Sequence, residues 1–248
     1  MSGGQLPRSV MVFAAGLGTR MRPVTDHLPK PLVKVGGIAL MDHVLDRFAA
    51  AGVARAVVNV HYLAGRIATH VAGRTHPQVV ISDERAQLLD QGGGIKRALP
   101  LLGPGPFLVC NTDAFWIAET APVLRDLGAA WNPAKMDMLL LVAEAATSIG
   151  VDWPGDFTID AQGRLHKRLE GSTAPFVYSG VAILSPEPFT QEKADVFKLA
   201  PLLFEAARRG RLYGHRLEGT WLHVGTPQAI GEAEAALALE HQRCQGSE

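Results

Sequence analysis

The chain has 248 residues, of which 47% are hydrophobic and 19% charged, a composition that can bury a sizeable core and excludes a disordered protein. Lys plus Arg and Asp plus Glu both total 24, and this zero net charge argues against a protein that coats nucleic acid or an anionic membrane. The length fits one α/β domain, and the sequence lacks the run of about 18 apolar residues that a membrane-spanning helix needs.

Cysteine usage and the amino-terminal sequence indicate the compartment. The chain has two cysteines, Cys110 in an apolar run and Cys244 near the end, so a disulfide framework is not expected. The first ten residues, MSGGQLPRSV, lack the apolar core of a signal peptide. We therefore expect a cytoplasmic protein in a reducing environment.

Strand and helix patterns alternate along the first half of the chain. Apolar runs predict strands at 10–15, 55–60, 78–82, 107–110 and 136–143. Helical spacing predicts helices at 40–48, 63–71, 95–103 and 121–130, the third of them entered through Gly92-Gly93-Gly94. This alternation predicts a mostly parallel sheet with helices on both faces.

The second half is richer in strand patterns. A turn at Gln162-Gly163 predicts a hairpin of 157–160 with 164–169. Further strands are expected at 176–184, 212–217 and 221–224, and helices at 199–209 and 229–241. The sequence shows neither a repeat nor a linker rich in Pro, Gly or Ser. We therefore expect one domain over 1–248, with a β-rich elaboration in its second half.

The stretch from Ala14 to Val35 reads AAGLGTRMRPVTDHLPKPLVKV and is unusually long and basic for a loop. Loops of this length are usually binding loops or lids, or are disordered. Gly16 and Gly18 permit backbone amides to approach an anion closely. Arg20 supplies a planar charged fork for phosphate oxygens, and Lys30 supplies a compact charge. The sequence favours an anion-binding loop, and a solvated basic loop is the alternative.

A second polar cluster, Asn111-Thr112-Asp113, follows the strand at 107–110. Ligands of open α/β sheets bind outside the carboxyl ends of the strands. Asp113 is interpreted either as a ligand of Mg²⁺ that bridges to substrate phosphates or as the N-cap of the following segment. Cations and a metal-binding acid around one cleft suit phosphoryl or nucleotidyl transfer.

Two other nucleotide-binding classes fit poorly. The first loop, GLGTRM, lacks the third glycine of the dinucleotide-binding fingerprint, and the strand VVNVH ends in His61 rather than an acid for a ribose hydroxyl. The G-x-x-x-x-G-K-[ST] pattern of a P-loop is also missing from the sequence.

The opening loop carries a family resemblance. AAGLGTRMRPVT followed by LPKPLVKVGG resembles the signature of the sugar-1-phosphate nucleotidyltransferase family. The similarity continues over nearly the whole chain, in LLDQGGGIKRALPLLG, FLVCNTD, PGDF, YSGVAILSPEPF, FKLAPLLFEAARRG and GTWLHVGTPQAIGEAE. Within the family it is greatest to the N-acetylmuramate-1-phosphate uridylyltransferases of bacterial cell-wall recycling.

The resemblance implies a Rossmann-like nucleotidyltransferase fold, with a mixed, mostly parallel sheet flanked by helices and a small β-rich elaboration on the sugar side. Residues of about 9–135 would form the nucleotide-binding half. Residues of about 136–248 would form the sugar-binding half and the C-terminal helix. In such an enzyme a sugar 1-phosphate attacks the α-phosphorus of UTP in line, which releases pyrophosphate and forms a UDP-sugar. The attacking phosphate is already an anion, so a general base is not required.

The resemblance also implies roles for individual residues. Arg20 would grip the departing pyrophosphate, Lys30 would neutralise the α-phosphate and the sugar phosphate, and Asp113 would bind Mg²⁺. The expected nucleotide-binding residues are Ala14, Ala15, Gly16, Gly18, Thr19, Arg20, Gln91, Gly92, Gly93 and Asn111, with Gly92 and Gly93 against the uracil. The expected sugar-binding residues are Lys30, Asp156, Glu170, Ser179 and Gly180, although purely structural roles for the last four remain open.

The chain departs from the family at one position. Family members usually carry a second metal-binding aspartate in G-x-W-x-D-x-G-T, and GTWLHVGT has His223 there. Neutral imidazole is a poor ligand for Mg²⁺. His223 would bind Mn²⁺, contact phosphate as a donor, or leave Mg²⁺ to Asp113, phosphates and water.

Several alternatives stay open at this point. One is a nucleotidyltransferase for another base or sugar, such as GTP with mannose 1-phosphate, or dTTP or UTP with glucose 1-phosphate. Another is a nucleotide-binding relative without catalysis, which His223 would favour. The expected partners are UTP and the sugar 1-phosphate, without nucleic acid or membrane, and the chain is expected to be a monomer or a weak homodimer.

Overall fold

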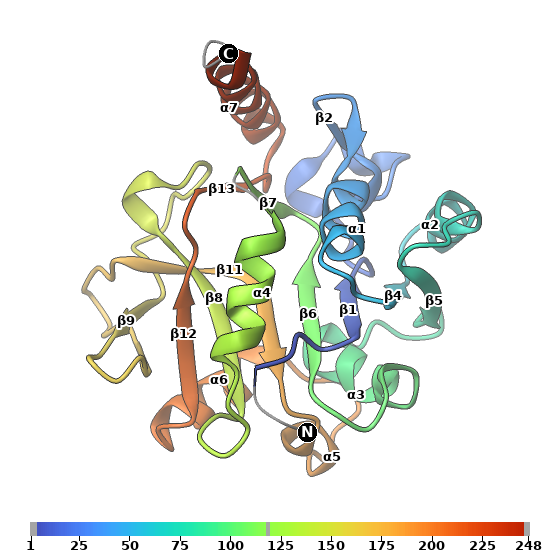
Figure 1. The fold of residues 1–248 in the computed structure, drawn as a ribbon. Helices are drawn as coiled ribbons and strands as arrows, with labels where there is room; N and C mark the ends of the chain where they lie inside the picture. Colours follow the sequence, from blue (N-terminus) through green and yellow to red (C-terminus); the bar gives the residue numbers. More distant parts are fainter. Residues whose placement is uncertain (1–3, 118–119, 246–248) are drawn as a thin grey trace.

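The computed structural model describes residues 4–117 and 120–245 (Figure 1). In this part of the chain nine strands form one sheet in the order β10-β9-β11-β6-β1-β4-β5, with β8 paired to β11 and β12 paired to β8. The strands are β1 (Ser9–Phe13), β4 (Arg55–Val60), β5 (Gln78–Asp83), β6 (Phe107–Asn111), β8 (Met138–Glu144), β9 (Phe157–Ile159), β10 (Leu165–Lys167), β11 (Phe176–Leu184) and β12 (Leu212–Arg216).

The sheet is mixed. Strands β6, β1, β4 and β5 run parallel to one another, and β12 runs parallel to β8. Strand β11 runs antiparallel to β6, β8 and β9, and β9 forms the predicted hairpin with β10. Because β11 pairs with both β6 and β8, strands from the two halves of the chain share one sheet. The functional division near residue 135 stays a prediction.

Helices cover both faces of the sheet, as predicted. The helices α1 (Leu40–Ala50), α2 (Ala64–Val71) and α4 (Thr120–Ala130) contribute to one core cluster, and α3 (Asp90–Leu102), α5 (Glu187–Thr190) and α6 (Leu199–Arg208) to another. Side chains of β1 alternate between the two, with Val10 and Val12 in the first cluster and Met11 in the second. All three are fully buried, which explains the continuous apolar run of this strand.

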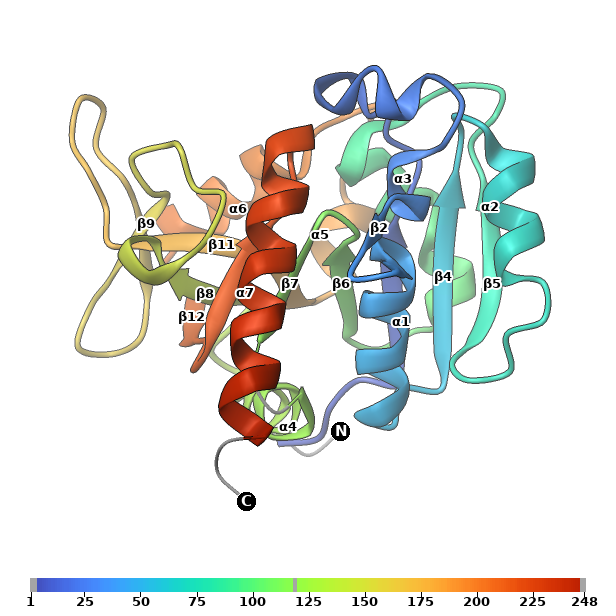
Figure 2. The same cartoon turned by 90° about the horizontal axis from the view of Figure 1, so that it is seen from above.

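Two small sheets flank the central one. Strand β2 (Lys34–Val35) pairs with β3 (Ile38–Ala39), and β7 (Ala114–Ile117) pairs with β13 (Thr220–His223). The C-terminal helix α7 (Pro227–Gln245) lies beside β2 and β13 (Figures 1 and 2). The N–H of Gly36 donates to Oε1 of Glu234 on this helix at 3.1 Å. None of the described helices is both long and apolar enough to cross a membrane.

The basic loop after β1 is folded rather than irregular. It contains 3₁₀ turns at Thr19–Met21, Val24–Asp26 and Lys30–Leu32. Gly18 adopts a φ of 65°, and its carbonyl accepts a hydrogen bond from Oγ1 of Thr25 at 2.7 Å. This left-handed conformation favours glycine, and a Cβ on Gly18 would also lie in tight contact, 3.1 Å from Cγ2 of Thr25.

Strand β1 is shorter than predicted, ending at Phe13 rather than Ala15. The N–H of Ala14 donates to Oδ1 of Asn59 at 2.8 Å, so a side chain rather than a neighbouring strand satisfies it. The chain turns into the basic loop at this hydrogen bond.

Candidate active site

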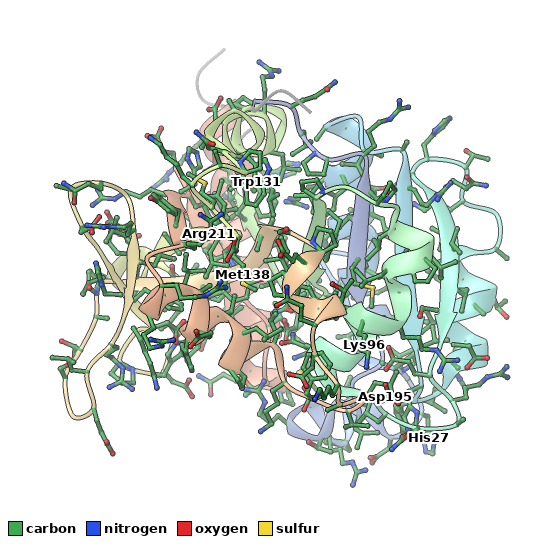
Figure 3. All side chains as sticks on the ribbon, turned by 90° about the horizontal axis from the view of Figure 1, so that it is seen from below. His27, Lys96, Trp131, Met138, Asp195 and Arg211 are labelled. Atoms are coloured by element: carbon green, nitrogen blue, oxygen red, sulfur yellow. The ribbon has the colours of Figure 1, made fainter. Side chains whose placement is uncertain are left out.

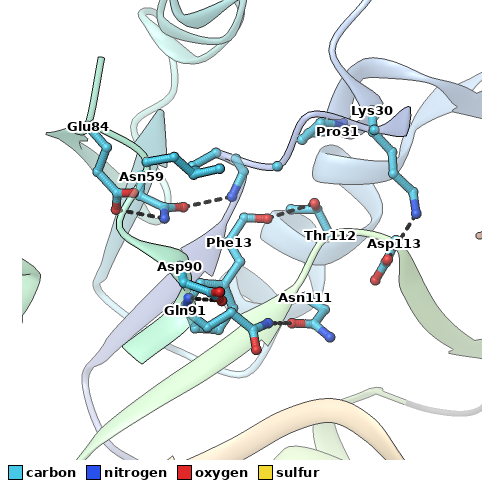
Figure 4. A pocket seen from close by; sticks show the side chains of 15 residues that line it. Phe13, Lys30, Pro31, Asn59, Glu84, Asp90, Gln91, Asn111, Thr112 and Asp113 are labelled. Atoms are coloured by element: carbon cyan, nitrogen blue, oxygen red, sulfur yellow. Dashed lines mark hydrogen bonds and ion pairs between the residues drawn. The ribbon is translucent and has the colours of Figure 1, made fainter. Parts of the chain in front are cut away.

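A cavity of about 320 Å³ lies at the carboxyl ends of β1 and β6 (Figure 4). The predicted site residues in its lining are Ala14, Ala15, Gly16, Gly18, Lys30, Gln91, Asn111 and Asp113. The other lining residues are Phe13, Pro31, Asn59, Glu84, Leu88, Asp90 and Thr112. The fold thus brings the glycine loop, the lysine and the aspartate to one cavity.

Lys30 and Asp113 form an ion pair at the edge of this cavity. Nζ of Lys30 lies 2.9 Å from Oδ2 of Asp113, and the side chains are 12% and 23% exposed. Burial acts to raise the pKa of Asp113, but His223 and Lys30 outweigh it and hold this pKa well below its usual value. Asp113 is therefore a carboxylate at neutral pH. Its interpretation as a helix N-cap is wrong, because the strand β7 follows it.

The pairing of β13 with β7 brings His223 beside Asp113. His223 is in register with Ala114, and its Nε2 lies 3.7 Å from Oδ2 of Asp113. Its Nδ1 lies 3.3 Å from the carbonyl oxygen of Gly150, so an Nδ1–H tautomer would donate there. The imidazole stacks on Trp221, with ring centroids 5.7 Å apart, and this packing limits its rotation.

Few side chains near Asp113 could bind a metal ion. The described residues contain no group of three or more His, Cys, Asp and Glu side chains that could hold a metal ion. Mg²⁺ is commonly held by one or two carboxylates together with substrate phosphates and water. Asp113 alone therefore fits an ion that takes its other ligands from the substrates, and the neighbouring imidazole suits softer ions better.

A buried polar network supports the start of the glycine loop. Asn59 accepts from the N–H of Ala14 and donates through Nδ2 to Oε1 of Glu84 at 2.8 Å. Glu84 is 1% exposed, and burial raises its pKa. Neither residue is among the site residues predicted from the sequence, although a polar side chain in the apolar run VVNV is a signal for Asn59.

Short polar contacts hold the other cavity walls. Oγ1 of Thr112 donates to the carbonyl of Phe13 at 2.9 Å, which ties β6 to β1. Nε2 of Gln91 donates to Oδ1 of Asn111 at 3.0 Å (Figure 4). Gly180 has a φ of 87°, and a Cβ there would lie 2.9 Å from Cβ of Asn111. The predicted residue Gly180 therefore packs against Asn111 at the irregularity of β11.

Four residues predicted to contact the nucleotide, Thr19, Arg20, Gly92 and Gly93, lie outside the cavity lining. Thr19 and Arg20 are exposed on the first 3₁₀ turn of the basic loop. Arg20 forms neither a hydrogen bond nor an ion pair with any residue that the structure describes. Its guanidinium is therefore available to a ligand, and its predicted phosphate contact stays a prediction.

The glycine triplet is inside α3, not in a loop before it, because this helix begins at Asp90. A Cβ on Gly93 would lie 2.1 Å from the carbonyl oxygen of Asp195, and one on Gly92 would lie 2.4 Å from the ring of Phe197. Nζ of Lys96 reaches Oδ1 of Asp195 at 2.8 Å, and the two side chains lie side by side in Figure 3. The absence of a Cβ thus lets the segment 195–197 pack against Gly92 and Gly93, and their predicted uracil contact stays a prediction.

The remaining sugar-side candidates are spread out. Asp156 lines a second cavity of about 300 Å³, and its Oδ2 accepts from the N–H of Tyr178 at 2.9 Å. Ser179 is buried, and its backbone carbonyl accepts from Nε1 of Trp221 at 3.0 Å, while the predicted sugar contact of its side chain stays a prediction. Glu170 is exposed in a turn and lines neither cavity.

Comparison with known proteins identifies the family. Residues 10–218 match the family described as the MobA-like NTP transferase domain. The chain is 48% identical to N-acetylmuramate alpha-1-phosphate uridylyltransferase of Caulobacter vibrioides over 238 residues, which cover 94% of this chain and 98% of that protein. It is 36% identical to the protein of the same name from Neisseria meningitidis serogroup B over 228 residues, which cover 91% and 96%.

A solved structure supports the same assignment at the level of the fold. HddC from Yersinia pseudotuberculosis, complexed with GMP-PN, matches with a TM-score of 0.71 at 22% identity, over 93% of this chain and 99% of that one. The cavity at the carboxyl ends of β1 and β6, the glycine loop and the sequence identity agree with one another. The chain is therefore a nucleotidyltransferase with a MobA-like NTP transferase domain and belongs to the family of the N-acetylmuramate α-1-phosphate uridylyltransferases.

Proposed function

We propose that the chain transfers a uridylyl group from UTP to N-acetylmuramate 1-phosphate, forming UDP-N-acetylmuramate and pyrophosphate. The identity of 48% to a protein of that name, over almost the full length of both chains, supports the substrate pair. The observation that carries the chemistry is the Lys30–Asp113 pair at the mouth of a cavity bordered by Gly16 and Gly18.

The reaction joins two anions. An oxygen of the sugar phosphate would form a bond to the α-phosphorus of UTP while the bond to the β-phosphate oxygen breaks, and pyrophosphate leaves with the electron pair. The barrier is largely electrostatic repulsion and misalignment, so neutralising and positioning groups suffice. A Cβ on Gly16 would meet nothing within 4 Å, so the backbone there is open to a phosphate.

Lys30 would change partners during binding. In the structure its ammonium is neutralised by Asp113 at 2.9 Å. A phosphate entering the cavity would compete for this ammonium, and Lys30 would then bridge the α-phosphate and the sugar phosphate. The exposed Arg20 would reach the β- and γ-phosphates, where its fork matches the charge that builds on the leaving group.

Asp113 would hold a Mg²⁺ ion, with Mn²⁺ as the alternative. When bound, the ion would neutralise phosphate charge and help to align the two substrates. His223, 3.7 Å from Asp113, would act as a donor to phosphate or as a ligand of a softer ion. We further propose a cytoplasmic protein of cell-wall recycling, a monomer or weak homodimer.

A substrate panel tests the proposal. Purified protein with Mg²⁺ would be given each of UTP, GTP, CTP and dTTP together with the 1-phosphates of N-acetylmuramate, glucose and mannose. We expect pyrophosphate release to be fastest with UTP and N-acetylmuramate 1-phosphate, and mass spectrometry to identify UDP-N-acetylmuramate. A faster reaction with another pair would replace the proposed substrates.

One observation favours a second candidate function. His223 occupies a position where the family usually has an aspartate, so the chain would be a nucleotide-binding protein without efficient turnover. Calorimetric binding of UTP without pyrophosphate release from any pair in the panel, unaffected by Asp113→Ala, would establish that function instead.

A further inference from the structure

The second cavity, of about 300 Å³, lies between the β9–β10 hairpin, β11 and α6. These elements lie together at one end of the molecule, away from α2 and β5 (Figure 2). Its apolar wall includes Phe157 of β9 and Leu203 and Phe204 of α6. Two cationic side chains, Lys167 and Arg168, line the same cavity. A space of this kind suits a ligand group that is both anionic and partly apolar.

The two cations lack carboxylate partners, unlike others in the same hairpin. Arg164 and His166 both lie within ion-pair distance of Asp160. Within the residues that the structure describes, neither Lys167 nor Arg168 forms an ion pair. Nζ of Lys167 lies 4.2 Å from the centroid of the Phe204 ring, a cation–π contact that leaves its hydrogen-bond donors unused.

Arg168 is held in place by backbone carbonyls. Its Nε donates to Gly155 at 3.0 Å, and its Nη1 donates to Ser172 at 2.8 Å and to Leu169 at 3.2 Å. These contacts fix the guanidinium without neutralising its charge. The preorganised cation is therefore available to an anion at little cost in side-chain entropy.

The lining of the second cavity has two further polar residues, Tyr178 and Asp156. The hydroxyl of Tyr178 is buried and has no hydrogen-bond partner among the described residues. Burial raises the pKa of Tyr178 well above its usual value, so the hydroxyl remains a donor. Asp156 is the acid in the lining, and its Oδ2 already accepts from the N–H of Tyr178. The lining thus carries two cations without carboxylate partners and one partly satisfied carboxylate, together with a tyrosine whose buried hydroxyl has no partner among the described residues.

Strand β11 connects the second cavity with the nucleotide cavity. Tyr178 is two residues before Gly180, which packs against Asn111 in the first cavity. Two residues of a strand span roughly 6–7 Å, which is comparable with the width of a sugar ring. Tyr178 and Phe13, which line the second and first cavities, pack against the same core cluster on the α3 and α6 face of the sheet.

We infer that the second cavity binds the lactyl group of N-acetylmuramate 1-phosphate, with Lys167 and Arg168 holding its carboxylate and the wall of Phe157 and Phe204 receiving its methyl group. This inference rests on the proposed function. The lactyl ether is what distinguishes this sugar from N-acetylglucosamine, and it is both anionic and partly apolar. The cavity would therefore select for the acidic sugar.

Steady-state kinetics with two matched substrates test the inference. The kcat/KM ratio for N-acetylmuramate 1-phosphate over N-acetylglucosamine 1-phosphate would be measured for the unmodified chain, Lys167→Gln, Arg168→Gln and Tyr178→Phe. We expect the ratio to fall by roughly tenfold to a hundredfold for each cation, mainly through KM for the acidic sugar. We expect a smaller fall for Tyr178→Phe. Activity on N-acetylglucosamine 1-phosphate shows that each variant is folded.

Lys135→Gln is the matched control, because Lys135 is exposed and lines neither cavity. It should leave the ratio unchanged. A preference for the acidic sugar that survives in both Lys167→Gln and Arg168→Gln overturns the lactyl site and leaves the proposed function intact. If the unmodified chain shows no preference for the acidic sugar, both the lactyl site and the proposed function are overturned.

Discussion

Nζ of Lys30 lies 2.9 Å from Oδ2 of Asp113, although the two residues are 83 positions apart in the chain. The basic loop after β1 carries the lysine, and the segment after β6 carries the acid, so the parallel pairing of these strands brings them together. This ion pair therefore neutralises both side chains before substrate arrives. Substrate phosphates and their counterion would replace this one internal ion pair by several contacts between opposite charges.

Asp113→Asn should abolish most of the activity. The change preserves size but removes the carboxylate that would hold the ion, so kcat should fall about a hundredfold or more. Pyrophosphate release under saturating substrates measures this, with circular dichroism to verify folding. Asp195→Asn is the control, because Asp195 is exposed and outside the cavity lining. A kcat within a factor of about two of the unmodified chain would contradict the role of Asp113.

Arg20→Ala should weaken catalysis without weakening the fold. The side chain is exposed and has no partner among the described residues, so its loss should change the melting temperature little. Loss of a charge-assisted contact to the leaving group should lower kcat/KM for UTP by roughly tenfold to a hundredfold. Arg55 is the first residue of β4 and so lies at the amino ends of the parallel strands, and Arg55→Ala should leave kcat/KM for UTP unchanged. Equal kcat/KM values for UTP in the two variants would show that Arg20 does not contact the nucleotide.

His223→Asp should change the metal preference. The substitution places a second carboxylate close to Asp113, and paired carboxylates suit Mg²⁺ better than an imidazole does. We expect tighter binding of Mg²⁺ by calorimetry and a higher ratio of Mg²⁺-supported to Mn²⁺-supported activity. An unchanged ratio and unchanged binding would show that His223 lies outside the coordination shell of the ion.

Gly93→Ala should displace the segment that covers α3. The new Cβ would lie 2.1 Å from the carbonyl oxygen of Asp195, a contact that requires the backbone to shift. We expect a loss of about 1–3 kcal/mol in the free energy of unfolding and faster proteolysis within 192–198. Gly73→Ala, where a Cβ meets nothing within 4 Å, is the control. Equal free energies of unfolding of the two variants would show that the segment 195–197 shifts at no cost in stability.

Glu84 should give the protein a measurable pH dependence of stability. Burial raises the pKa of Glu84 above its usual value of 4.5. The folded state therefore holds this proton more tightly than the unfolded chain, and ionising Glu84 lowers the free energy of unfolding as pH rises through the folded pKa. Glu84→Gln cannot ionise. Urea titrations would give the free energy of unfolding of the unmodified chain and of Glu84→Gln. We expect the value for the unmodified chain minus that for the variant to decrease between pH 4.5 and neutral pH. A difference that stays constant would show that the folded and unfolded states bind this proton equally.

The local pattern of apolar and polar residues predicts much of the secondary structure. The bounds predicted for β4 and β11 agree with the structure because buried strands are mostly apolar and turn residues flank them. Strand β7 was missed because its four residues follow the polar Asn111-Thr112-Asp113 directly and pair with the distant β13. A short strand whose partner is a hundred residues away leaves little local signal.

The sequence by itself determined the site residues that come from local motifs, namely the glycine loop, Lys30, Gln91, Asn111 and Asp113. Only the tertiary structure decided what these residues contact. It showed that Gly92 and Gly93 face the segment 195–197, that Asn59 and Glu84 support the loop, and that two unpaired cations share a second cavity. The physical reason is that backbone conformation is encoded by neighbours in sequence, whereas burial, ion pairing and close approach depend on residues that folding brings together from distant parts of the chain.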